Sequence, residues 1–394
     1  MINQRLRQLR LARGMTLDEL AAATGLLVTR HEISRYEHGQ DQPSPIVLQQ
    51  LAQVLGIRPT DLLSDHHQFQ IELITYRKRA VLSKRYQERM VALAQEILQN
   101  RLRLQELIGE SNRFDVPLFA YSITTLDEAE AAAADLRARW NLGSVPIANL
   151  TDTLEDRGLH VIALSPDDEL DDIAAIARDE TNVAVAAVMF SQRSYDGALW
   201  RMNLAHELAY LVLRLDNNKL NSEQAAFRFA TALLAPANDL RQYIGEHRNN
   251  LHPDELLLLK HHFGMSTQAL LDRMRTLGII KQRLYRQWMI ELNQRGWRHT
   301  EPEPLPVEEP LWFQRIILRA LAEELIDPTE AHRLLGEEVP SFDHTADTKG
   351  VCQSLLRQPL VARHTVLAEQ AAMAVDLYPA SSNVVNEVET SEHS

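Results

Sequence analysis

The sequence predicts a mainly α-helical protein whose second half adds a small β-sheet. Apolar residues recur at steps of three and four through the first 110 residues, which is the spacing of amphipathic helices. Two apolar runs, at 158–164 and 183–190, have the composition of strands. A length of 394 residues is enough for two or three domains. We therefore expect a short helical domain, a long helical linker and then an α+β domain.

Composition restricts the cellular compartment and the binding partners that we expect for this protein. A hydrophobic content of 45% describes an ordinary globular chain, and a single cysteine, Cys352, excludes an internal disulfide. The N-terminus leads directly into an amphipathic helix, so no signal peptide is expected, and no apolar run is long enough to span a bilayer. The net charge of −13 restricts nucleic-acid binding to a local surface. We expect a cytoplasmic protein with no membrane partner.

Residues 1–65 have the pattern of five short helices. The predicted spans are 2–13, 17–23, 28–39 and 44–55, and a fifth helix begins at 59. Thr16 and Glu19 form a capping box at the start of the second helix, and Gly14, Gly25 and Gly39 follow helix ends. The close spacing of the second and third helices predicts a helix-turn-helix arrangement.

Two strings in this domain resemble a known family. They are T-x-x-E-L-A from Thr16 and I-S-R-Y-E-H-G-Q-x-x-P-S from Ile33. They are similar to the XRE type of lambda-repressor-like helix-turn-helix domains, which implies that the third helix reads a DNA major groove. The resemblance also implies a buried ion pair between Arg10 and Glu37. The residues expected to face DNA are Thr29, Arg30, His31, Ser34 and Arg35.

The charge of this domain leaves a second interpretation open. Residues 1–65 contain seven arginines and seven acidic residues, so attraction to phosphate would be modest. Small helical domains also serve as dimerisation or protein-binding modules. We favour DNA binding because the outward side of the third helix carries Arg and Ser rather than apolar residues.

Residues 66–120 are predicted to form a helical linker. From 69 to 110 there is no proline, and the apolar spacing indicates one long helix or two stacked ones. A basic cluster on its first half is interpreted as a solvated face, with contact to flanking DNA phosphates as the alternative; it comprises Arg77, Lys78, Arg79, Lys84, Arg85 and Arg89. The break at 112–117 marks the boundary of the next domain.

Residues 121–300 combine helices with the two predicted strands. Thr125 and Glu128 form a capping box before an Ala-rich helix that extends to Trp140, and 146–155 follows as a helix. The acidic run 167–172 is interpreted as a solvated turn. Downstream helices are predicted within 238–262 and at 265–277 and 284–295.

The helix around His206 carries an incomplete zinc motif. In H-E-x-x-H, two imidazoles lie one turn apart and bind zinc, and the Glu acts on the metal-bound water as general base. Here His206 and Glu207 are present, but Tyr210 stands at the second His position. A phenol, with an ordinary pKa near 10, is a poorer zinc ligand at neutral pH than imidazole. The downstream histidines His247, His252, His261 and His262 show no spacing that selects a replacement.

A second sequence pattern, which begins at Glu223, follows the His206 helix. Residues 201–210 and then E-x-x-A-x-x-F-A-x-x-L-L-x-P from Glu223 resemble the ImmA/IrrE family of metallopeptidase-like domains. The resemblance implies a zincin-like fold over 121–300, Glu223 as the third zinc ligand and Glu207 as a vestigial catalytic residue. With His206 and Glu223 alone we expect no cofactor, and zinc bound there is the alternative.

The C-terminal part is predicted to be a Pro-rich linker followed by helices over 301–375 and a disordered acidic tail over 376–394. The whole pattern predicts a transcriptional regulator that binds a double-stranded DNA operator as a homodimer, either as a repressor or as an antitoxin with a toxin or other protein partner. Its second domain would sense a signal or bind a partner. One alternative is an active zinc endopeptidase that cleaves a repressor protein, and another makes the second domain a pocket for a small metabolite.

Overall fold

The computed structural model describes residues 2–63, 69–74, 83–110, 114–164, 172–192, 194–215 and 220–335. These residues divide into two compact units, 2–63 and 69–335. Among them, no helix combines the length and apolar character needed to cross a membrane. Several predictions lie outside the described residues: Cys352, the tail 376–394, residues 167–171 of the acidic run, and Arg77, Lys78 and Arg79 of the basic cluster.

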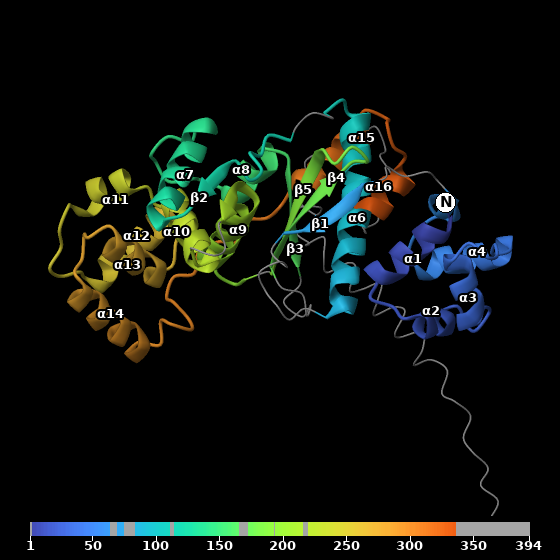
Figure 1. Cartoon of the computed structure of the whole chain (residues 1–394), viewed down its shortest axis with the longest axis horizontal. Coiled ribbons are helices and arrows are strands. Elements are labelled where there is room, and N and C mark those ends of the chain that lie inside the picture. The colour runs from blue at the N-terminus through green and yellow to red at the C-terminus, as the bar shows by residue number, and fades with distance from the viewer. Residues whose placement is uncertain are drawn as a thin grey trace, which may run out of the picture. The chain divides into compact units, whose positions relative to one another are not determined.

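The first unit consists of short helices around one apolar core (Figure 1). Leu9, Leu20, Ile33 and Leu51 are fully buried there. Helix α2 begins with the predicted Thr16–Glu19 capping box, which pairs two backbone N–H groups that the helix itself leaves unbonded. The helices are α1 (Ile2–Ala12), α2 (Leu17–Ala23), α3 (Arg30–Glu37), α4 (Pro45–Val54) and α5 (Pro59–Leu63).

The second unit contains a four-stranded mixed sheet. Its order is β1 (Gln70–Leu73), β4 (Ile173–Arg178), β5 (Ala184–Gln192) and β3 (Leu159–Leu164). Strand β3 pairs with β5 in parallel, and the other two pairs are antiparallel.

Both faces of this sheet are covered by helices because its strands are apolar on both sides. Ile162 and Leu164 pack against residues of α6 (Lys84–Leu107). Val161 and Ala163, which point to the opposite face, belong to the core that includes α9 (Gly197–Val212). Figure 1 shows α6 running beside β1 in the sheet.

The helical prediction for 69–110 is wrong at its start. Residues 70–73 form β1, an edge strand paired with β4, while 84–107 form the helix α6. Four residues are too few to separate a strand from a helix by apolar spacing. Strand β4 was not predicted either, because its alanines at 174, 175 and 177 carry little strand signal although all are buried in the sheet. Strand β1 and helix α6 therefore belong to the sheet layer of the second unit.

The remaining helices surround α9 and α10 (Ser222–Leu234). Helix α10 packs between α7 (Leu126–Arg139) and α9, and α7 begins with the predicted Thr125–Glu128 capping box. A short parallel pair joins β2 (Tyr121–Ile123) to β6 (Leu213–Leu215). The other helices are α8 (Leu150–Asp156), α11 (Ala237–Ile244), α12 (Pro253–Phe263), α13 (Thr267–Thr276) and α14 (Gln282–Gln294).

Residues 301–311, here called the strap, are tied to the second unit. The Glu308 carboxylate accepts hydrogen bonds from the backbone N–H groups of Leu150 and Thr151 at the start of α8, and it pairs with Arg201. Gly197 lies so close to the strap that a Cβ there would overlap the Pro306 carbonyl oxygen. The prolines suggested a linker, but the strap is held along its length by contacts with α8, α9, α12 and α13. After it, α15 (Trp312–Ala322) and α16 (Pro328–Leu335) pack on Leu104 and Ile108 at the end of α6.

Candidate functional site

Helix α3 of the first unit is positioned by its N-terminal capping box and by the side chains that it buries in the core. Thr29 forms a second capping box, accepting from the Glu32 N–H at 3.3 Å while Glu32 accepts from the Thr29 N–H at 2.8 Å. Hydrogen bonds from Thr29 lower the pKa of Glu32, which keeps this exposed carboxyl ionised at the helix start. Ile33 and Tyr36 are buried in the core of the unit. The opposite side of α3 therefore faces away from the core.

The residues predicted to face DNA lie on that outer side. Thr29, Arg30, His31 and Arg35 are exposed and Ser34 is half-buried. Two exposed ion pairs hold the arginines: Arg30 to Asp18 at 3.2 Å and Arg35 to Asp41 at 3.4 Å. Such surface pairs are weak, so both guanidinium groups can exchange these partners for phosphate or base edges. Contact with DNA itself stays a prediction.

The predicted buried ion pair of this unit is confirmed. Arg10 Nε donates to Glu37 Oε1 at 2.6 Å, and Arg10 Nη2 donates to Glu37 Oε2 at 2.8 Å. Arg10 Nη1 also donates to the Met15 carbonyl oxygen. The two-pronged pairing joins α1 to α3 across the core, which fixes the orientation of the exposed face.

The second candidate site lies where α9 meets the start of α10. Glu207 and Tyr210 are almost completely buried, at 1% exposed each. The His206 side chain is 17% exposed and that of Glu223 is 53% exposed. The Asn221 side chain caps α10 and places Glu223 in its first turn. Two helices thus bring together four of the residues selected from the sequence.

The contacts among these residues are direct. The Tyr210 hydroxyl donates to Glu223 Oε1 at 2.6 Å, and His206 Nε2 lies 3.3 Å from Glu223 Oε2. The rings of His206 and Tyr210 meet edge to face at 5.1 Å between centroids. His206 Nδ1 lies 3.7 Å from Glu207 Oε1. The Tyr210 hydroxyl is therefore bonded to one of the two remaining candidate zinc ligands, Glu223.

The donor set at this site does not fit a catalytic zinc centre. Such centres use three protein ligands, usually imidazole, carboxylate or thiolate groups. His206 and Glu223 supply two, and the third position holds a phenol whose hydroxyl is hydrogen-bonded to Glu223. Across the described ranges no three His, Cys, Asp or Glu side chains are grouped as a metal site would require. None of the four downstream histidines therefore completes the set.

Those histidines have other surroundings. His252 caps α12, His261 lies 2.9 Å from Glu303 of the strap, and His262 stacks on Tyr243. His247 is exposed.

The site opens onto a cavity of about 710 Å³ that the sequence analysis did not identify. Besides His206 and Glu223, its lining comes from α10 and from the distant helix α13, including Phe227, Arg228, Asp272 and Arg275. Arg228 pairs with Glu130 at 2.6 Å, and Arg275 pairs with Asp272 at 2.7 Å. No spacing in the sequence connects α13 with His206, so this wall became visible only in the folded chain.

Comparison with known families identifies both domains. Residues 6–62 match the family model described as a helix-turn-helix, and residues 155–275 match the IrrE N-terminal-like domain. No curated protein matches the chain. The matches support a DNA-binding regulator with a metallopeptidase-like domain. The chain thus combines an XRE-type helix-turn-helix domain with an IrrE-type metallopeptidase-like domain.

Proposed function

We propose that the protein is a transcriptional regulator, a repressor or an antitoxin, that binds a two-fold-symmetric operator as a homodimer. Its metallopeptidase-like domain works without zinc as a sensing or partner-binding module. The observation that carries this proposal is the Tyr210 hydroxyl, which occupies the place of a zinc ligand and donates to Glu223 at 2.6 Å. A site closed in this way keeps the shape of a peptidase domain while lacking the group that activates water.

The contacts around Glu223 support a role for this domain that needs no metal. His206 and Tyr210 each interact with Glu223, so the carboxylate that would bind zinc is engaged from two sides. Opening the site to a metal would break the phenol–carboxylate hydrogen bond and leave a buried hydroxyl to find another acceptor. The adjacent cavity remains available to a ligand or a protein segment.

The DNA-binding part is tested by the double variant Arg30→Ala/Arg35→Ala. Each lost base-edge contact costs about 1–3 kcal/mol, so binding to the operator should weaken on the order of thirty-fold or more. The measurement is gel retardation of the protein's own promoter at fixed salt. The matched control replaces Arg295 and Arg319, two exposed arginines of the second unit that are also paired with nearby glutamates. Equal operator binding by the Arg30/Arg35 variant and the control would reject α3 as the reading helix.

The metal-free part is tested by zinc titration calorimetry of the wild type, Tyr210→His and Tyr210→Phe. The wild type should bind far less than one zinc per chain. Tyr210→His adds an imidazole to His206 and Glu223 and should bind zinc stoichiometrically, whereas Tyr210→Phe removes the hydroxyl without adding a ligand and should not. Tight stoichiometric zinc in the wild type would contradict the metal-free site and favour the alternative, a zinc endopeptidase.

A further inference from the structure

A second cavity lies beside the His206 cavity and is not part of the incomplete zinc site. It encloses about 670 Å³ between α9, α10, α13, α14 and residues 297–304. The two cavities share Phe227 and Asp272 as lining residues. Much of the wall lies beyond residue 275, where the match to the IrrE N-terminal-like domain ends. The volume is within the range of about 300–1,000 Å³ that is typical of small-molecule sites.

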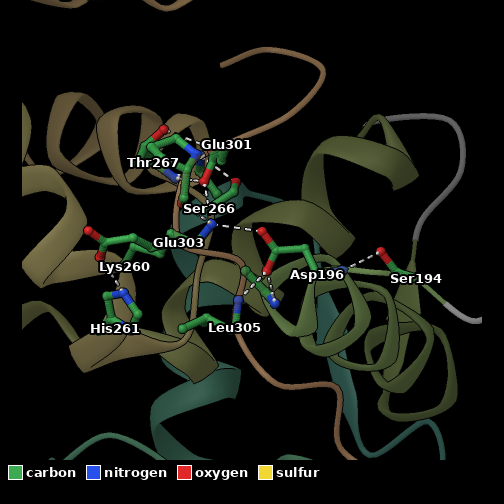
Figure 2. A network of polar contacts seen from close by, with 12 residues as sticks. Ser194, Asp196, Lys260, His261, Ser266, Thr267, Glu301, Glu303 and Leu305 are labelled. Atoms are coloured by element: carbon green, nitrogen blue, oxygen red, sulfur yellow. Dashed lines mark hydrogen bonds and ion pairs between the residues drawn. The ribbon is translucent and has the colours of Figure 1, made fainter. Parts of the chain in front are cut away.

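One wall of this cavity is held in place by a buried lysine. The Lys260 side chain is fully buried, and its Nζ lies 2.7 Å from Asp196 Oδ2, 3.2 Å from Glu301 Oε2 and 3.3 Å from the Pro302 carbonyl oxygen. Removing a buried cation from such a cluster would leave two carboxylates without their counter-charge. Figure 2 shows Lys260 and its two carboxylate partners in this network. The lysine thereby joins α12 to the start of α9 and to the strap.

Further hydrogen bonds hold the same two carboxylates. Glu301 accepts from the backbone N–H and the hydroxyl of Thr267 at the start of α13, and Asp196 Oδ1 accepts from the Leu305 N–H (Figure 2). The wall is therefore formed before any ligand arrives, which lowers the entropic cost of binding.

The charged groups around this cavity cancel. Three lining carboxylates, Asp196, Asp272 and Glu301, are balanced by lining Arg298 and by two cations behind the wall, Lys260 and Arg275. Asp196 and Glu301 direct their oxygens to Lys260 and to backbone N–H groups, and Asp272 accepts from Arg275. An ion entering the cavity would lose its hydration without meeting an opposite net charge, and this is unfavourable.

The apolar part of the lining is rich in rings. Phe227, Tyr285 and Trp297 line the cavity together with Leu199, Met202 and Ala269. Aromatic side chains bind flat rings by offset stacking or edge-to-face contact. Ser194, Gln268 and Thr300 add hydrogen-bonding groups to the lining. These surfaces suit a flat molecule with one or two neutral polar groups.

We propose that this cavity binds a small, neutral aromatic molecule. The proposal deepens the sensing role assigned above, and it rests on that role only for the biological purpose of the ligand. Binding itself depends on the second unit and is measured in the full chain without DNA.

The test uses three probes with the same naphthalene ring: 2-naphthalenemethanol, 2-naphthoate and 2-naphthylmethylammonium. Equilibrium dialysis against the full-length protein should show saturable binding of the neutral alcohol, about tenfold tighter than either ion. Leu199→Glu places a carboxylate in the lining and should weaken binding of the neutral alcohol by about tenfold. Leu199 is 52% exposed, so the substitution leaves the core intact. Leu258→Glu is the matched control: Leu258 is 62% exposed on α12 and does not line the cavity, so binding should not change.

A second variant, Trp297→Ala, removes a ring without adding charge and should weaken binding of the neutral alcohol roughly two- to tenfold. Absence of saturable binding, tighter binding of either ion, or equal affinity in the Leu199→Glu and Leu258→Glu proteins would overturn the proposal. Its failure is distinct from failure of the proposed function, because operator binding and zinc content are measured on the same protein without these probes.

Discussion

Each unit of the molecule contains a buried pairing of arginine with glutamate, Arg10 with Glu37 and Arg101 with Glu155, and these two pairings differ in geometry. In the first unit, Arg10 holds Glu37 through two hydrogen bonds of 2.6 and 2.8 Å. In the second, Arg101 of α6 lies 4.0 Å from Glu155 Oε1 at the nearest approach. Glu155 Oε2 accepts from the Trp312 N–H at 2.9 Å, but Oε1 finds no hydrogen-bond donor in the part of the chain that the structure describes.

In the second unit, the long distance between Arg101 and Glu155 leaves burial as the main influence on the pKa of Glu155. Burial raises the pKa of Glu155 to about 7, while Arg101 and the Trp312 N–H oppose the shift without cancelling it. Burial likewise lowers the pKa of Arg101 to about 10, against the attraction of Glu155. Two smaller effects act on the same carboxyl: the charge of Arg315 lowers the pKa of Glu155, and the charge of Asp152 raises it. The same two residue types thus form a well-bonded ion pair in one core and a loosely bonded, titratable pair in the other.

The largest effect is expected from Glu37→Ala. Removing one partner leaves Arg10 buried without its counter-charge, which costs roughly 3–5 kcal/mol of unfolding free energy. Urea unfolding of the full chain, followed by hydrogen exchange in residues 2–63, measures the loss. The control is Asp41→Ala, which removes the exposed partner of Arg35 and should change stability by about 1 kcal/mol or less. A Glu37→Ala protein as stable as the control would show that the two-pronged pair contributes no more than a surface contact.

The second largest effect is expected in the pH dependence of unfolding, because Glu155 makes the unfolding free energy of the second unit depend on pH. Because the folded-state pKa is raised from 4.5 to about 7, the folded protein binds the proton more tightly than the unfolded chain does. The resulting stabilisation is complete below about pH 4.5 and is lost as the pH rises through about 7, with a total on the order of 1–3 kcal/mol.

Glu155→Gln, which stays neutral, should remove this dependence. The measurement is the difference in unfolding free energy between wild type and variant at pH 5.5, 6.5 and 7.5. Glu291→Gln, at an exposed position on α14, serves as the control and should keep the wild-type slope. Parallel pH profiles for wild type and Glu155→Gln would mean that Glu155 stays ionised and that the two buried pairs are alike.

The smallest effect is expected at the exposed pair of Asp18 with Arg30. Both side chains are largely solvated, so Asp18→Asn should change the unfolding free energy by only about 0.2–1 kcal/mol. Urea unfolding in the presence and absence of added salt measures it. A larger loss would make this pair a structural tie between α2 and α3 and would weaken the contrast between buried and exposed pairs.

Local patterns predicted much of the fold. The capping boxes at Thr16 and Thr125 depend on residues three positions apart, and the structure confirms both. The pairing of Arg10 with Glu37 followed from resemblance to a known domain. By contrast, β1 and β4 were missed, because a four-residue edge strand and an alanine-rich buried strand lack a distinctive periodicity.

The candidate sites also combine features that could be predicted from the sequence with features that could not. The outward face of α3 and the tyrosine at the second histidine position of H-E-x-x-H were both visible in the sequence, because each depends on positions within one or two turns of a helix. The cavity beside His206 was not visible, because Asp272 and Arg275 reach it from α13.

The sequence by itself determined most of the helices, their caps, the helix-turn-helix order and the departure from H-E-x-x-H at Tyr210, since these depend on neighbours a few residues apart. Tertiary structure alone decided which distant groups meet. Lys260 meets Asp196 and Glu301, and Arg101 approaches Glu155 without bonding it closely. The physical reason is that the distance and hydration of such pairs depend on how whole helices and strands pack, and that packing sets the charge each buried group keeps.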